Sequence, residues 1–177
     1  MMPNKITRDQ MEIYLREVGG EIDARGMLGE ILIVGGAYMT LVLSPRVSTK
    51  DVDAVIGGDP NAVRSAAAIV ARRHGLPDDW INDAAKDFLY RSPKTTLWAQ
   101  YPGLRIYMPT PDYIFAMKAT AARPVDFADL ITLKSVLALS SFDEAARIVE
   151  RYTPASRIRP QTQFMLEALF EKGPRNE

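Results

Sequence analysis

Residues 30–36 read Glu-Ile-Leu-Ile-Val-Gly-Gly, and the fold is predicted outward from this stretch. The β-branched run predicts a short buried strand, and the paired glycines predict a tight turn into a helix that reaches about residue 43. Residues 51–56, Asp-Val-Asp-Ala-Val-Ile, predict a second strand. Side chains two positions apart in a strand point to the same face. Asp51 and Asp53 are therefore expected side by side on one face.

Two carboxylates on one face repel each other unless a cation neutralises them. Mg²⁺ is typically held by one or two carboxylates together with substrate phosphates, and a glycine turn lets backbone N–H groups approach phosphate closely. The turn at Gly35-Gly36 and the pair Asp51/Asp53 thus predict metal-assisted phosphoryl chemistry with Mg²⁺ or Mn²⁺. The structural alternatives are an ordinary tight turn and a solvated acidic strand face.

Composition excludes several other classes of site. The 177 residues include no cysteine and a single histidine, His74, which excludes disulfides, thiol catalysis and poly-histidine metal sites. The 22 basic and 22 acidic residues balance, so the net charge does not predict strong nonspecific binding to nucleic acid. No apolar run approaches the roughly 20 residues of a membrane span, and the first residues lack a signal-peptide core. A cytoplasmic protein with no membrane partner is expected.

The order of predicted elements favours an α+β fold. Strands and helices mix in the first two thirds and helices fill the last third, so we expect an α/β core with an N-terminal helix over residues 1–109 and a helical subdomain over 110–177 packed on it. Residues 77–92 are expected to form short helical turns and loop, and Pro102-Gly103 to join a hairpin of strands 95–101 and 104–108. Cap and proline signals predict the helices 8–24, 60–74, 111–121, 126–139, 142–152 and 160–172.

A second motif lies at residues 116–130, Ala-Met-Lys-Ala-Thr-Ala-Ala-Arg-Pro-Val-Asp-Phe-Ala-Asp-Leu. Together with the glycine turn and residues 46–53, Arg-Val-Ser-Thr-Lys-Asp-Val-Asp, it resembles the nucleotidyltransferase superfamily. The closer resemblance is to small bacterial nucleotidyltransferases of the AbiEii toxin type, and it spans about residues 30–135. It implies a nucleotidyltransferase-like small mixed sheet flanked by helices, with a C-terminal helical cluster.

The resemblance implies roles for residues of the first motif. Asp51 and Asp53 would hold the metal and act in catalysis, and Gly35 and Gly36 would meet the triphosphate. Tyr38, which stands where the family often carries a hydroxyl side chain after the glycines, is assigned to the nucleotide as well.

Further roles fall on four residues. Lys118 would contact a phosphate oxygen, and Asp126 would match the family's last functional carboxylate. Arg46 and Thr49 would shape the turn into the metal strand beside the nucleotide.

The implied reaction moves a nucleoside monophosphate from a nucleoside triphosphate to an acceptor hydroxyl on RNA, such as tRNA, or on protein. The chain would then be a toxin–antitoxin component with a cognate antitoxin or toxin as partner. The alternative is a non-catalytic module of the same fold, acting as an antitoxin or a nucleotide-binding partner. It is motivated by Ala37-Tyr38 after the glycines and by strand 104–108, which lacks a third carboxylate.

The second motif also has structural alternatives. Lys118 would simply be solvated, Asp126 would cap the following helix, and Arg123 would pair with Asp126 or Asp129 to hold two helices at an angle. Four arginines near the C-terminal helices would form either a phosphate-contact patch for RNA or a solvated helical face: Arg147, Arg151, Arg157 and Arg159.

Overall fold

The computed structural model describes residues 5–43 and 48–171 and divides into two compact units. The first unit comprises Met1–Lys86 and Lys94–Pro109, and the second comprises Asp87–Pro93 and Thr110–Glu177. The sequence places a boundary at residue 109, but it assigns residues 87–93 to the first unit, whereas the structure groups them with the second. Over the described residues, none of the helices has the length and apolar character that crossing a membrane requires.

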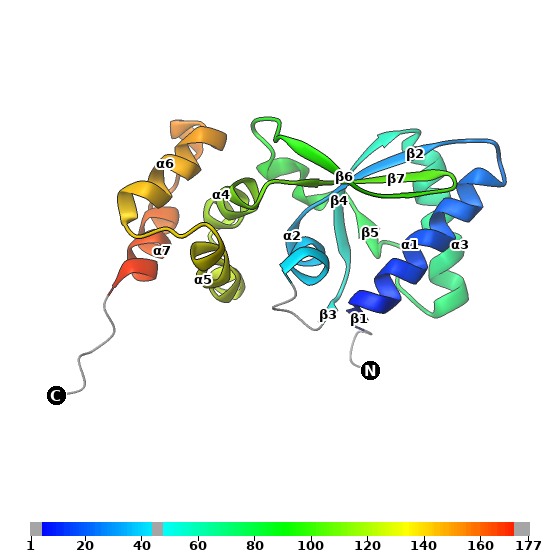
Figure 1. Cartoon of the computed structure of the whole chain (residues 1–177), viewed down its shortest axis with the longest axis horizontal. Coiled ribbons are helices and arrows are strands. Elements are labelled where there is room, and N and C mark those ends of the chain that lie inside the picture. Colours follow the sequence, from blue (N-terminus) through cyan, green and yellow to red (C-terminus); the bar gives the residue numbers. More distant parts are fainter. Residues whose placement is uncertain (1–4, 44–47, 172–177) are drawn as a thin grey trace. The chain divides into compact units, whose positions relative to one another are not determined.

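A mixed five-stranded sheet forms the centre of the first unit, with the order β5-β4-β2-β7-β6 (Figure 1). The central strand β2 pairs antiparallel with β4 and parallel with β7, while β4 and β5 are parallel and β6 and β7 antiparallel. The predicted α+β class is confirmed. The strands are β2 (Gly29–Ile33), β4 (Val52–Gly58), β5 (Ile81–Asn82), β6 (Thr95–Tyr101) and β7 (Leu104–Pro109).

Helices α1 (Arg8–Asp23) and α3 (Pro60–His74) pack against each other and against this sheet (Figure 1). Helix α1 begins with a capping box, in which the Thr7 side chain accepts from the Gln10 N–H and the Gln10 side chain accepts from the Thr7 N–H. The glycine pair 19–20 does not end α1. A Cβ on Gly19 would lie 2.5 Å from the Pro102 carbonyl oxygen, so this glycine lets the helix approach the β6–β7 turn.

Sequence signals at the ends of α3 are also confirmed. The Asp59 carboxylate accepts from the N–H groups of Asn61 and Ala62, Pro60 is the first helical residue, and Gly75 ends the helix with φ of 67°. The core of the first unit includes Met11, Leu15, Ile31, Ile33, Ala54, Val63, Val70, Trp80 and Ile106.

The strand β2 leads into a helical segment with two geometries. It starts as α2 (Gly35–Tyr38) and continues as a π-helical stretch (Met39–Leu43), which confirms the predicted turn and helix. A small separate pair joins β1 (Ile6–Thr7) to β3 (Ser48–Thr49), just before β4.

The second unit is helical, with α4 (Pro111–Ala121) as its most buried element. Its eight residues from 113 to 120 are all buried, because α4 contacts α5 (Phe127–Val136), α6 (Phe142–Tyr152) and α7 (Pro160–Phe170). Short 3-10 turns at Pro124–Asp126 (η3) and Ala155–Arg157 (η4) precede α5 and α7. A helix that is buried on nearly every side belongs at the centre of a cluster.

Residues 77–92 contain more regular structure than expected. The expected helical turn is present as a 3-10 helix at Ala84–Phe88 (η2), but β5, which joins the edge of the sheet beside β4, was not predicted. The strand β5 has two residues, too few to show the alternation by which a strand is recognised in a sequence.

Candidate functional site

The end of β2 and the start of β4 meet at what we call the Gly–Asp corner, defined by Val34, Gly35, Gly36, Asp51 and Asp53. The register places Ile33 opposite Ala54, and the Val34 N–H donates to the Asp53 carbonyl at 2.9 Å. The glycine turn and the Asp-x-Asp segment are therefore neighbours in space, although 14 residues lie between Gly36 and Asp51 in the sequence.

Gly35 allows this closeness in two ways. Its φ is +64°, a left-handed conformation that other residues adopt only with strain, and a Cβ there would lie 2.6 Å from Oδ2 of Asp53. No side chain fits between the backbone at Gly35 and that carboxylate. The carboxylate of Asp53 consequently lies directly against the start of α2, where the first N–H groups of a helix have no acceptor within the helix.

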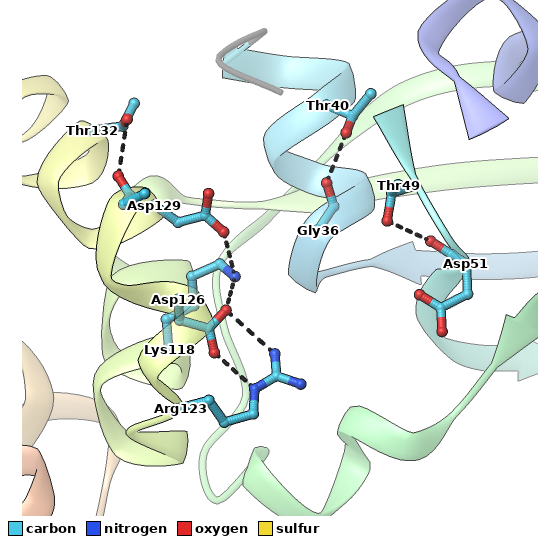
Figure 2. A network of polar contacts seen from close by, with 10 residues as sticks. Gly36, Thr40, Thr49, Asp51, Lys118, Arg123, Asp126, Asp129 and Thr132 are labelled. Carbon is cyan, nitrogen blue, oxygen red and sulfur yellow. Dashed lines mark hydrogen bonds and ion pairs between the residues drawn. The ribbon is translucent and has the colours of Figure 1, made fainter. Parts of the chain in front are cut away.

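Asp51 and Asp53 alternate with two residues of the core. Val52 and Ala54 are buried at 0% and 1% exposure, whereas both aspartates are partly exposed. The two carboxylates therefore occupy the more open side of the chain as it enters β4, as the sequence predicts. Hydrogen bonds hold the backbone here: the Val52 N–H donates to the Trp80 carbonyl at 2.6 Å, and the Thr49 hydroxyl donates to the Asp51 carbonyl at 3.1 Å (Figure 2).

The other residues assigned to the first motif have different outcomes. Thr49 is buried and shapes the turn before Asp51, in agreement with its predicted structural role. The Tyr38 side chain is 1% exposed and belongs to the core, so its burial argues against a nucleotide contact. Arg46 lies outside the described residues.

In the second unit, Lys118 forms the centre of a lysine–aspartate network with Arg123, Asp126 and Asp129 (Figure 2). The Lys118 Nζ lies 2.7 Å from Oδ1 of Asp126 and 2.9 Å from Oδ2 of Asp129. Arg123 Nε donates to the other oxygen of Asp126 at 2.7 Å. These bonds connect the last turns of α4 to η3 and the first turn of α5.

Burial makes this network important for stability. Lys118, Asp126 and Asp129 are 4%, 1% and 3% exposed, while the Arg123 side chain remains 59% exposed. Burial alone would raise the pKa of Asp126, but hydrogen bonds and charge from Arg123 and Lys118 outweigh it and hold that pKa below its usual value. The two cations and two anions balance, so each buried charge has an opposite partner.

The structure bears on the structural alternatives for the second motif. The alternative of a solvated Lys118 is wrong, because this lysine is 4% exposed and its ammonium contacts Asp126 and Asp129. Asp126 stands at the N-cap position of α5, but its side chain makes no capping hydrogen bond. The predicted pairing of Arg123 with Asp126 is confirmed.

The chemistry of the Gly–Asp corner fits a hard divalent cation. Asp51 and Asp53 supply carboxylate oxygens, and Mg²⁺ commonly takes one or two such ligands and completes its shell with water and phosphate oxygens. Within residues 5–43 and 48–171, no group of three or more histidine, cysteine, aspartate or glutamate side chains could hold a metal by itself. A metal at this corner would thus rely on the substrate for further ligands.

One neighbour of the site was not predicted from the sequence. Asn82 of β5 pairs with Asp53 in the parallel register of β4 and β5. The turn-like composition of residues 77–83 hides the strand, and only the buried pair Trp80-Ile81 within it points to an ordered, packed segment.

Comparisons with protein-family profiles, with curated proteins and with solved structures found no match.

Proposed function

We propose that this protein is a nucleotidyltransferase that binds a nucleoside triphosphate with Mg²⁺ or Mn²⁺ at the Gly–Asp corner. The supporting observation is the contact between Gly35 and Asp53, where the backbone at the start of a helix faces a carboxylate at closest approach. A phosphate-binding turn beside a pair of metal-binding carboxylates is the arrangement that metal-assisted phosphoryl transfer requires. The mixed sheet around the corner is compatible with a nucleotidyltransferase-like fold.

Each residue of the corner has a role in this proposal. Gly35 and Gly36 would present backbone N–H groups to the phosphates. The absence of a Cβ at Gly35 lets the Asp53 carboxylate lie beside this backbone. Asp51 and Asp53 would hold the cation, which when bound supplies neutralisation of the phosphate charge. Thr49 fixes the backbone at Asp51 and so positions the first carboxylate.

The proposed reaction forms one bond and breaks one. The oxygen of an acceptor hydroxyl bonds to the α-phosphorus of the nucleotide, and the bond from that phosphorus to the oxygen bridging to the β-phosphate breaks. Pyrophosphate leaves with the electron pair, and the hydroxyl proton passes to solvent. Alignment of the two substrates supplies the rate enhancement, as positioning does in phosphoryl transfer generally. The acceptor is RNA, such as tRNA, or protein, and the toxin of a toxin–antitoxin pair is the biological role we propose.

A specific observation supports a second candidate, a non-catalytic module of the same kind. Lys118, which the resemblance assigns to phosphate, is buried and already bound to Asp126 and Asp129. Strand β7 carries no carboxylate. On this reading the corner binds a nucleotide without turning it over, and the chain acts as an antitoxin or as a nucleotide-binding partner.

Labelled nucleotides distinguish the two candidates. The full chain is incubated with each α-³²P nucleoside triphosphate, Mg²⁺, total cellular RNA and protein, beside the double variant Asp51→Asn/Asp53→Asn. Asp59→Asn is the matched control, because asparagine caps a helix as well as aspartate while removing one carboxylate from the same part of the chain.

Label in an RNA or protein band with the wild type and the control, but not with the double variant, supports the transferase and names its acceptor. Mg²⁺-dependent nucleotide binding without label, lost in the double variant, supports the non-catalytic module. If the wild type neither binds nucleotide nor transfers label, both candidates are wrong. Growth arrest on induction of the wild type, absent with the double variant, tests the toxin role.

A further inference from the structure

A cavity of about 300 Å³ in the second unit is lined by two arginines and by no carboxylate. It lies where the segment 87–93, the end of α4 and the start of α7 come together within that unit. The lining residues are Phe88, Tyr90, Thr120, Ser156, Arg157 and Arg159.

Arg159 is fixed at the edge of this cavity. Its Nη2 donates to the carbonyl oxygens of Thr120 and Ala121 at 3.2 and 2.9 Å, the last residues of α4. A cation at a helix C-terminus complements the helix dipole, which accounts for the placement of Arg159. These bonds use one of its three nitrogens, and in the described part of the chain the Nε and Nη1 donors of Arg159 have no hydrogen-bond partner.

Arg157 is held by a different kind of contact. Its guanidinium carbon lies 5.7 Å from the centre of the Tyr90 ring, a cation–π contact that orients the group without using its N–H donors. Across residues 5–43 and 48–171, the Arg157 side chain has no hydrogen bond or ion pair. All five of its guanidinium N–H donors are thus available to a ligand.

The charges of the lining select an anion. Two guanidinium groups share one concavity without a carboxylate to neutralise them, and the planar fork of an arginine matches the oxygens of a phosphate. Ser156 adds a hydroxyl donor, whereas the Thr120 hydroxyl is already bonded to Thr153. The rings of Phe88 and Tyr90 give the remaining wall an aromatic surface, on which nucleic-acid bases stack.

We propose that this cavity binds the phosphate group of a nucleotide, either free or within a single-stranded RNA. Arg157 and Arg159 donate to the phosphate oxygens, and the aromatic wall takes the base. The site uses no residue of the Gly–Asp corner and needs no divalent metal. It therefore does not depend on the function proposed above.

The test follows the arginine side chains of the full-length chain by NMR. Nε–H signals are recorded in EDTA while AMP, an eight-nucleotide single-stranded RNA, or inorganic phosphate is added. Arg157→Gln is the diagnostic variant, since Arg157 makes no hydrogen bond whose loss would loosen the fold. Arg147→Gln is the matched control: it removes the same charge from an exposed position of the same unit, away from the cavity.

We expect AMP or the RNA to shift the Nε–H signals of Arg157 and Arg159, and Arg157→Gln to weaken binding about tenfold or more. Arg147→Gln should change affinity less than twofold. A response to AMP identifies a free nucleotide as sufficient, and a response to the RNA alone identifies a strand; both support the site. Binding must also survive in Asp51→Asn/Asp53→Asn, which separates this test from that of the transferase. Equal losses in the two arginine variants, or unmoved signals with every probe at millimolar concentration, would overturn the proposal.

Discussion

Replacing Gly35 by alanine tests the geometry of the Gly–Asp corner directly. The new Cβ would lie 2.6 Å from Oδ2 and 3.3 Å from Cβ of Asp53, so the aspartate side chain must move. The residue would also keep a φ of +64°, which costs a non-glycine residue about 1–2 kcal/mol. Adding about 1 kcal/mol for the displaced side chain, we expect the free energy of unfolding to fall by about 2–3 kcal/mol.

Gly20→Ala is the matched control for this substitution. A Cβ at Gly20 meets nothing within 4 Å, and the residue lies inside α1. Because alanine favours a helix over glycine by about 0.5–1 kcal/mol, we expect this variant to be more stable than the wild type. Gly35→Ala should therefore lower the free energy of unfolding, whereas Gly20→Ala should raise it.

A double-mutant cycle with Asp53→Ala separates the cost of the positive φ at position 35 from the cost of the steric clash between the new Cβ and the Asp53 side chain. Alanine at position 53 removes Oδ2, so Gly35→Ala should cost about 1 kcal/mol less in that background, while the cost of the positive φ remains. Urea unfolding followed by tryptophan fluorescence is the assay, because Trp80 and Trp98 both belong to the first unit. Additive costs, or a Gly35→Ala variant as stable as Gly20→Ala, would show that the corner does not have the geometry described. Nucleotide binding by Gly35→Ala should be weaker than by the wild type or by Gly20→Ala.

Three further predictions concern buried groups. Lys118→Met leaves two carboxylates in the core without their shared ammonium and should lower the free energy of unfolding, followed by circular dichroism, by about 3–5 kcal/mol. Arg123→Met should lower it less, because the Lys118 ammonium still contacts both carboxylates. The folded-state pKa of Asp126 lies below the ordinary value of 3.8. The ionised Asp126 carboxylate therefore stabilises the fold fully above pH 3.8, and this stabilisation is lost as the pH falls through the folded-state pKa. The difference in the free energy of unfolding between wild type and Asp126→Asn should shrink over that acidic range and stay constant from about pH 5 to 7. Tyr38→Phe keeps the buried ring and should change nucleotide affinity less than twofold, and a tenfold loss would restore Tyr38 to the binding site.

The sequence is most informative where a local rule fixes the backbone. Asp59-Pro60 and Gly75 set the ends of α3 through capping and a left-handed glycine, and both depend only on neighbours along the chain. The alternation around Asp51 and Asp53 likewise predicts which side of the strand carries the carboxylates. These parts of the fold and of the candidate site follow from spacing alone.

Other features depend on partners that are distant in the sequence or hidden by composition. Lys118 reads as a surface residue because lysine is rarely buried, and only the folding of α5 back onto α4 brings Asp126 and Asp129 to it. Tyr38 follows the glycines in sequence, but the helical rotation of α2 directs it into the core. The strand β5 is recognisable only once β4 is there to pair with it.

The division of the chain into units also constrains how the protein is made and how it can be cut. The polypeptide passes from one unit to the other after residues 86, 93 and 109, so neither unit is a continuous piece. During synthesis the central strand β2 cannot pair with its parallel neighbour β7 until more than 70 further residues have emerged from the ribosome. A fragment ending at residue 86 would lack two of the five strands and leave one side of β2 unpaired. Gene fusions and deletions should therefore treat the region up to residue 109 as indivisible.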